Sequence, residues 1–260
     1  MRLEGKTAFI SGGGRNSGKA IATTFAREGA NLILIAKERI ESLNETTKEC
    51  ESYGAKVLPL LADVGQHEEV NRVVKLGLER FGKIDQLVCV AAYRHHQPFF
   101  EHTYDEWLST FAVNVHSAFS LTKAILPGML ERKSGNIIAL GSTLALTSRK
   151  NHSMETSCKH ALYGLIKAIA AEFTPSGIRA NYLVVSAIQN KRANPELYPW
   201  EAAGDDTISA SGTRILPMGR RGTSQEVANV ALFLASDQSS YISGDRILCS
   251  GGKYLYVARN

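Results

Sequence analysis

The stretch that most constrains the fold runs from residue 7 to residue 26, where a short apolar run meets a glycine cluster and a helical pattern follows. The apolar run is too short for a helix, whereas Ile21 and Phe25 recur at helical spacing. This order is typical of the strand–turn–helix that opens a βαβ unit. The sequence therefore predicts a mixed α/β architecture from its first elements.

The glycine turn also suggests a ligand. Glycines there let backbone N–H groups approach a phosphate, which the positive end of the following helix also attracts. The spacing departs from Gly-x-Gly-x-x-Gly, because the third glycine position is Ser17. A turn of this kind can equally be a plain connector, so by itself it does not define a nucleotide site.

Apolar strands alternate with helical stretches along the rest of the chain. Further strands are expected at 31–36, 56–62, 85–90, 136–140, 179–185 and 246–249, and helices at about 38–53, 68–81, 104–132, 154–173 and 225–235. This alternation predicts a doubly wound parallel sheet with helices on both faces and a ligand beyond the carboxyl ends of its strands. We expect one Rossmann-type domain over residues 1–260, with a substrate lid around 186–221 that carries Tyr198 and Trp200.

Composition narrows the class of protein. A chain of 260 residues with 44% hydrophobic content can bury one large core, and no apolar run approaches the roughly 18 residues of a membrane helix. The net charge of +5 is spread along the chain, which weakly favours an anionic ligand and gives little support to nucleic-acid binding. We expect a cytoplasmic protein with reduced thiols and no metal site, because its cysteines are widely spaced: Cys50, Cys89, Cys158 and Cys249.

Short motifs occur in one order over almost the whole chain. They are Ser11–Gly18, Asp63-Val64, Asn114-Val115, Ser142, Lys159, Gly177–Asn181, and the tail segments 217–222, 241–244 and 250–252. In joint order and spacing they resemble the short-chain dehydrogenase/reductase family, in which the first motif reads Thr-Gly-x-x-x-Gly-x-Gly. The resemblance implies a nicotinamide nucleotide cofactor, a small-molecule substrate and a homodimer or homotetramer.

The resemblance also implies roles for individual residues. The implied catalytic positions are Asn114, Ser142, Glu155 and Lys159. The implied cofactor contacts are Ser11, Gly12, Gly14, Arg15, Asn16, Ser17, Gly18, Lys37, Asp63, Val64, Ala91, Lys159 and Ile188.

The largest departure from the family lies at its Tyr-x-x-x-Lys motif, where the tyrosine position, four residues before Lys159, is Glu155. A second Tyr-x-x-x-Lys occurs at Tyr163 and Lys167. We reject it as the catalytic pair, because the residues that follow continue the family pattern in the Lys159 register. Tyr163 is about two helical turns farther along, which favours a core or subunit-contact role.

Glu155 changes the expected chemistry. Residues four apart share a helix face, so Glu155 and Lys159 are placed to form an ion pair. Lysine would keep the carboxyl ionised and therefore a poor acid, whereas burial would raise its pKa. Some plant members of the resembled family carry Glu at this position and reduce a conjugated C=C bond, which favours enone reduction here. A helix ion pair without a catalytic role stays open.

The cofactor preference rests on charge at the turn and after the second strand. Arg15 and Lys37 are cations where the 2′-phosphate of NADP(H) would lie, and Ala36 occupies the position of the carboxylate typical of NAD sites. We therefore expect NADP(H) over NAD(H). Asn16 replaces the middle glycine of the turn and would crowd the pyrophosphate if that position requires a positive φ, a conformation that Asn tolerates.

Two functional classes stay open at this point. One is an NADP(H)-dependent oxidoreductase whose proton chemistry is reassigned to Glu155, Ser142 or a histidine. The other is a nucleotide-binding protein without redox turnover, with a lyase or isomerase using Glu155 as base as a related option. His95 and His96 follow the fourth strand near the cleft, and adjacent loop histidines of this kind are typically solvated.

Overall fold

The computed structural model describes residues 1–189 and 216–254. Its seven strands are β1 (Thr7–Ser11), β2 (Asn31–Ala36), β3 (Val57–Leu61), β4 (Gln86–Cys89), β5 (Gly135–Leu140), β6 (Ile178–Val185) and β7 (Arg246–Cys249). Its α-helices are α1 (Asn16–Arg27), α2 (Ile40–Glu51), α3 (His67–Phe81), α4 (Tyr104–Phe111), α5 (Ser117–Glu131), α6 (Ser153–Phe173) and α8 (Ser224–Ala235). Most of the expected lid, with Tyr198 and Trp200, lies outside the described residues.

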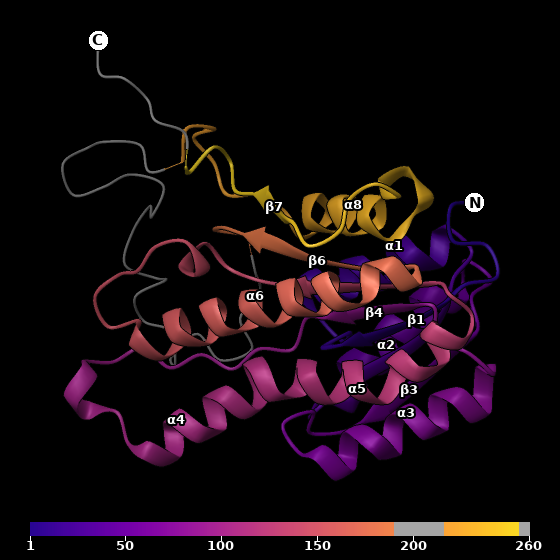
Figure 1. Ribbon diagram of the computed structural model, residues 1–260, viewed down its shortest axis with the longest axis horizontal. Coiled ribbons are helices and arrows are strands. Elements are labelled where there is room, and N and C mark those ends of the chain that lie inside the picture. The colour runs from indigo at the N-terminus through magenta and orange to yellow at the C-terminus, as the bar shows by residue number, and fades with distance from the viewer. Residues whose placement is uncertain (190–215, 255–260) are drawn as a thin grey trace.

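The strands form one parallel sheet in the order β3-β2-β1-β4-β5-β6-β7. In Figure 1 its labelled strands run from β7, near the top, to β3, lower in the view. The doubly wound parallel sheet predicted from the sequence is therefore confirmed. The chain reverses its direction of travel across the sheet between β1 and β4. In open α/β sheets, ligands bind beyond the carboxyl ends of the strands at such a reversal.

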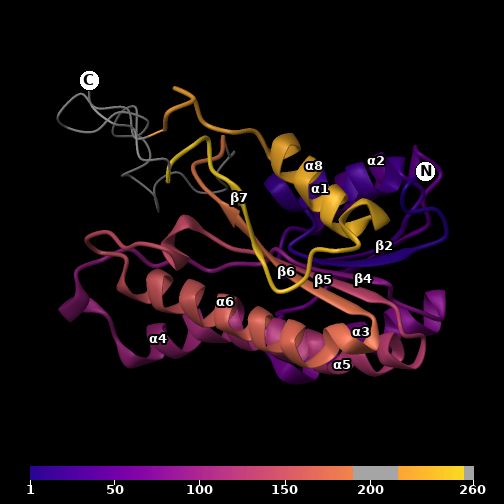
Figure 2. The same cartoon turned by 45° about the horizontal axis from the view of Figure 1, so that its top comes forward.

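Helices cover both faces of the sheet, as Figure 2 shows. Helices α1, α2 and α8 pack on one face, and α3, α5 and α6 pack on the other. Neighbouring strand residues point to opposite layers, so that Phe9 belongs to the second layer and Ile10 to the first. Burial on both faces explains why the strands read as continuous apolar runs.

The long helix expected at 104–132 is interrupted. Between α4 and α5 the backbone forms a π-helical turn at Ala112–His116, and Asn114 is the buried residue within it. The sequence pattern continues through this turn, which is why the interruption was not predicted. π-turns of this kind occur frequently at functional sites, because they turn one side chain out of the regular helical register.

Within residues 1–189 and 216–254, no helix is both long enough and apolar enough to cross a lipid bilayer.

Candidate active site

The turn between β1 and α1 is shaped for close backbone approach. Gly12 has φ +76°, and a Cβ there would lie 3.0 Å from the backbone nitrogen of Ala91. A Cβ on Gly18 would overlap the carbonyl of Gly12, so this position also requires glycine. Asn16 has φ +48°, the conformation expected of the glycine it replaces. Asn is among the few residues that adopt it readily.

Not every N–H group of the turn is available to a ligand. The Gly12 and Gly13 amides both donate to the carbonyl of Ile35, and the Ser11 hydroxyl oxygen accepts from the amides that follow β4. Helix α1 begins at Asn16 without a side-chain cap from Arg15, so its first-turn amides remain the natural phosphate donors. The cradle and the uncapped helix end fit the pyrophosphate of a dinucleotide.

Two of the residues expected to contact the cofactor, Lys37 and Asp63, contact each other. The Lys37 ammonium, after β2, lies 2.8 Å from Asp63 Oδ2, after β3. Burial raises the pKa of Asp63, but the Lys37 ammonium and the Gly65 N–H outweigh it and leave the pKa below its usual value. The Lys37 side chain is 61% exposed, so it is held by one partner while still open to a ligand. Val64, beside Asp63, is buried.

The π-turn and α6 bring Asn114 and Lys159 together. Lys159 Nζ donates to Asn114 Oδ1 at 3.3 Å, and both side chains are buried. The Asn114 amide nitrogen donates to the carbonyls of Tyr93 and Thr110, which fixes its orientation. Burial lowers the pKa of Lys159, the nearby Glu155 carboxylate opposes that effect, and Arg94 adds to it.

Glu155 does not form the expected ion pair with Lys159 in the described structure. Its carboxylate instead contacts His96 Nε2 at 2.6 Å and Arg94 Nε at 3.6 Å, and its side chain is 4% exposed. The expectation that His96 is solvated is therefore wrong, because the loop after β4 folds over α6. The helix periodicity correctly placed Glu155 and Lys159 on one face, but it could not show that a distant loop supplies the partners.

The surroundings decide the protonation state of Glu155. Burial is the largest single influence on the pKa of Glu155, and it raises that pKa. The hydrogen bond from His96 and the charges of Arg94 and Lys159 together outweigh burial and bring the pKa to about 2. Glu155 is therefore a carboxylate at neutral pH.

Ser142 follows β5 at the same edge of the sheet. Its hydroxyl oxygen accepts from the Leu144 amide at 3.2 Å, and its own amide donates to the Tyr182 hydroxyl. Tyr182 donates in turn to the Lys159 carbonyl, so this buried tyrosine of β6 ties the serine to α6. Sequence reasoning missed it. Two features of the sequence could have identified Tyr182. One is a tyrosine within an apolar strand, because a buried hydroxyl needs a hydrogen-bond partner. The other is Gly141, where a Cβ would overlap the Tyr182 ring.

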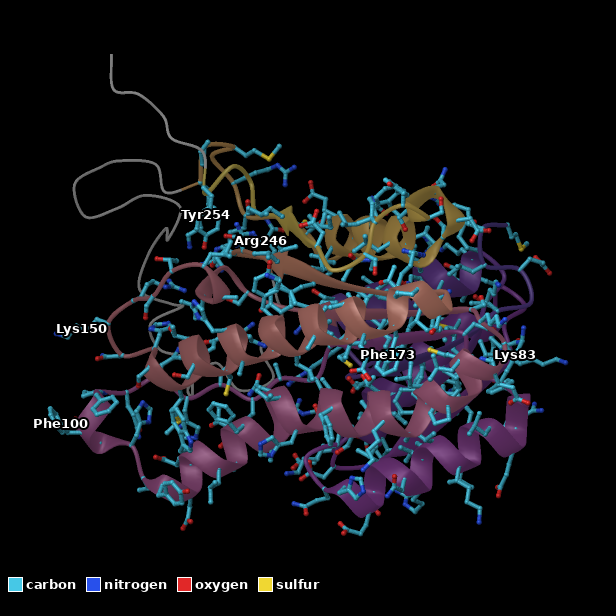
Figure 3. The ribbon with its side chains drawn as sticks, in the orientation of Figure 1. Lys83, Phe100, Lys150, Phe173, Arg246 and Tyr254 are labelled. Atoms are coloured by element: carbon cyan, nitrogen blue, oxygen red, sulfur yellow. The ribbon has the colours of Figure 1, made fainter. Side chains whose placement is uncertain are left out.

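Ile188 lies just beyond β6, where it forms an isolated parallel bridge with Gly222 and is buried. The Tyr254 hydroxyl donates to the Thr143 carbonyl at 2.6 Å, next to Ser142. In Figure 3, Lys150 and Tyr254 lie toward the end of the molecule opposite Lys83, which precedes β4. The segments that carry the site therefore gather beyond the carboxyl ends of the strands.

The fold and the phosphate cradle define a nucleotide-binding α/β protein of the doubly wound class. A family model described as "Enoyl-(Acyl carrier protein) reductase" matches residues 14–253. Together with the relatives below, this match shows that the chain belongs to the short-chain dehydrogenase/reductase family, whose members use NAD(P) nucleotides. The chain is accordingly an oxidoreductase of the short-chain dehydrogenase/reductase type.

The relatives match over nearly their full length. A 3-oxoacyl-[acyl-carrier-protein] reductase, FabG, of Thermotoga maritima is 32% identical over 97% of this chain and 99% of its own. The oxidoreductase UcpA of Escherichia coli K12 is 32% identical over 98% and 96%. Among solved structures, levodione reductase matches with a TM-score of 0.89 at 28% identity, covering 97% of this chain and 98% of its own.

Proposed function

We propose that the protein is an NADP(H)-dependent oxidoreductase that acts on a small organic carbonyl or a conjugated enone, with Ser142, Glu155 and Lys159 at its reactive centre. One observation carries the proposal. Three buried polar side chains, the hydrogen-bonded pair Asn114 and Lys159 together with Glu155, lie at the carboxyl edge of the sheet, and the phosphate cradle lies at the same edge. Lys159 and Glu155 lie one turn apart on α6, where the family carries its lysine and tyrosine.

The preference for NADP(H) rests on charge at the ribose end. Lys37 and Arg15 are cations near the ends of β2 and β1, and β2 ends at Ala36, which has no carboxylate to bind ribose hydroxyls. The contact with Asp63 orients the Lys37 side chain and leaves it 61% exposed, which supports a role in binding the 2′-phosphate. When bound, the nicotinamide supplies a hydride to the substrate or takes one up.

Glu155 sets the type of substrate. A carboxylate with a pKa of about 2 is a poor proton donor at neutral pH, and it repels negative charge that develops on a carbonyl oxygen. A conjugated enone spreads that charge into an enolate, which the Ser142 hydroxyl and the Lys159 ammonium would stabilise. The description of the matching family model, an enoyl reductase, agrees with C=C reduction.

A second candidate is a lyase or isomerase that uses Glu155 as its base, with the nucleotide site idle. The ionised carboxylate has a free lone pair for a proton, but a pKa of about 2 makes it a weak base at neutral pH, which favours the oxidoreductase. A nucleotide-binding protein without turnover is the remaining alternative. Retention of Asn114, Ser142 and Lys159 favours the oxidoreductase, since a binding protein has no evident use for all three.

We also propose that the protein is located in the cytoplasm. All four cysteines are free thiols, and burial raises the pKa of Cys50, Cys89 and Cys158 to about 12, which keeps them unreactive. Such thiols suit a reducing compartment.

Calorimetric titration with NADPH and NADH tests the cofactor assignment. We expect tighter binding of NADPH, and Lys37→Ala should reduce that preference by roughly tenfold or more through loss of one charged contact. Lys75→Ala, which removes an exposed cation on α3, is the control. Equal affinities in the natural protein would refute the assignment. A screen of NADPH consumption over ketones, enones and quinones then tests turnover, with Lys159→Ala as the inactive reference.

A further inference from the structure

The cluster of side chains around Glu155 carries more positive than negative charge. Arg94 and Lys159 are cations that both act on the one carboxylate, and His96 donates to it. His152 stacks on His96 with ring centroids 4.0 Å apart. In residues 1–189 and 216–254, Glu155 is the only carboxylate in contact with Arg94.

Other charged groups nearby do not offset this excess of positive charge around Glu155. Glu106, the next carboxylate in the same region, accepts from the Thr103 amide and the Gln97 side chain, and it lies 3.6 Å from His95. Arg149 lies close enough to His152 to add to the lowering of its pKa, which burial chiefly causes. Arg149 therefore brings a further cation close to this cluster. Positive charge that is partly removed from water is stabilised by an anion nearby.

Arg94 is the group best placed to bind that anion. Its guanidinium has five N–H donors, and within the described part of the chain its one ionic contact is with Glu155, at 3.6 Å. The side chain is 35% exposed, whereas Glu155 beneath it is 4% exposed. Arg94 thus lies between the buried carboxylate and solvent, with donors left for a ligand that approaches from solvent.

We propose that the substrate carries an anionic oxygen group, which the Arg94 guanidinium binds beside Glu155. This inference rests on the proposed function and names its substrate class: a small keto acid or enoic acid, or the corresponding phosphonate. Arginine suits this task because its planar fork matches the oxygens of carboxylates and phosphates. The anion would offset the excess positive charge around Glu155, and it would hold the reactive carbon of the substrate near Lys159 and Ser142.

The same side chains suggest a metal site, which the charges oppose. His96, His152 and Glu155 offer ligand atoms within 4.8 Å of one another. A divalent cation there would be repelled by Arg94 and Lys159, and it would displace the 2.6 Å contact between His96 and Glu155.

The test compares matched acids and esters. The substrate pair is 4-oxopent-2-enoate and its methyl ester, assayed with NADPH at constant ionic strength, because salt screens exposed charges. The natural protein should prefer the acid, and Arg94→Gln should lower the ratio of kcat/KM for the acid to that for the ester by roughly tenfold or more, which cancels any effect of Arg94 on Glu155 that both substrates share. Arg94→Lys, which keeps the charge, should recover part of the loss. Arg80→Gln, on α3, is the remote control.

A binding measurement separates failure of this inference from failure of the proposed function. Without cofactor, calorimetry should show glutarate and methylphosphonate binding to the natural protein and to Arg80→Gln, and about tenfold or weaker binding to Arg94→Gln. The stronger of the two anions identifies the oxygen group. If neither acid nor ester is reduced but this pattern holds, the inference stands and the proposed reaction fails.

Four results would overturn the inference. The first is reduction of the ester as efficient as that of the acid, and the second is an equal loss for both in Arg94→Gln. The third is no binding of glutarate or methylphosphonate. The fourth is anion binding or turnover that requires added Zn²⁺ or Mn²⁺ and is abolished by a chelator, which would assign the histidines to a metal.

Discussion

At the scale of single residues, Glu155 is defined by partners from two parts of the chain. Lys159, on its own helix, influences its charge, while Arg94 and His96 reach it from the loop after β4. The identity and helix position of Glu155 could be predicted from the motif, but its ionisation could not. That property depends on whether burial or the three neighbouring groups Arg94, His96 and Lys159 prevail, and only the folded loop decides it.

The depressed pKa makes Glu155 a source of stability that depends on pH. A carboxyl whose pKa falls from 4.5 to about 2 on folding stabilises the folded state at neutral pH by about 3 kcal/mol. This contribution is complete above the unfolded pKa and is lost as the pH falls through the folded value. Urea unfolding of the natural protein and Glu155→Gln should therefore show a difference in free energy that shrinks from about pH 6 to about pH 3. A difference that is constant over this range would contradict an ionised Glu155.

At the scale of elements, the sheet and its helices could be predicted closely, and the interruption of one helix could not. The pattern of apolar residues predicts the ends of β1 to β7 within about two residues. The same pattern predicts one uninterrupted helix over 104–132. The π-turn at Ala112–His116 leaves that periodicity intact while it turns Asn114 toward Lys159. A feature that shifts one side chain without changing the pattern leaves no signal in the sequence.

Helix α6 also carries the motif that was rejected as the catalytic pair. Tyr163 packs against Tyr182 with ring centroids 5.2 Å apart, and Lys167 Nζ lies 5.6 Å from the centre of its ring. Tyr163→Phe keeps these ring contacts, so turnover should stay within about twofold of the natural value. Lys159→Ala should lower turnover by about a hundredfold or more. A severe loss in Tyr163→Phe, with the circular dichroism spectrum unchanged, would show that the catalytic register is Tyr163–Lys167.

At the scale of the whole molecule, apolar side chains remain on the outer helices. Leu108 on α4 is 44% exposed and Phe119 on α5 is 51% exposed. Members of the resembled family pair this long helix and the Lys159 helix across subunits, and exposed apolar residues on it support the same arrangement here. The sequence could predict the apolar content of these helices, but not which residues the monomer leaves uncovered.

We therefore predict a homodimer or homotetramer in solution. Phe119→Glu should shift the mass measured by light scattering toward the monomer, because a charge in an apolar subunit contact is costly. Leu78→Glu, at a 37% exposed position on α3, should leave the assembly unchanged. A natural protein whose mass stays that of a monomer at every concentration would refute the prediction.

The central claim is that an ionised Glu155, in the place of the family's tyrosine, disfavours ketone reduction and favours enone reduction. The direct measurement is kcat/KM with NADPH for a ketone and its matching enone, in the natural protein, Glu155→Tyr and Glu155→Ala. The natural protein should reduce the enone and be slow on the ketone. Glu155→Tyr should shift the ratio toward the ketone by about tenfold or more, because it restores a proton donor beside Lys159. Rapid ketone reduction by the natural protein that is unchanged in Glu155→Ala would contradict the claim.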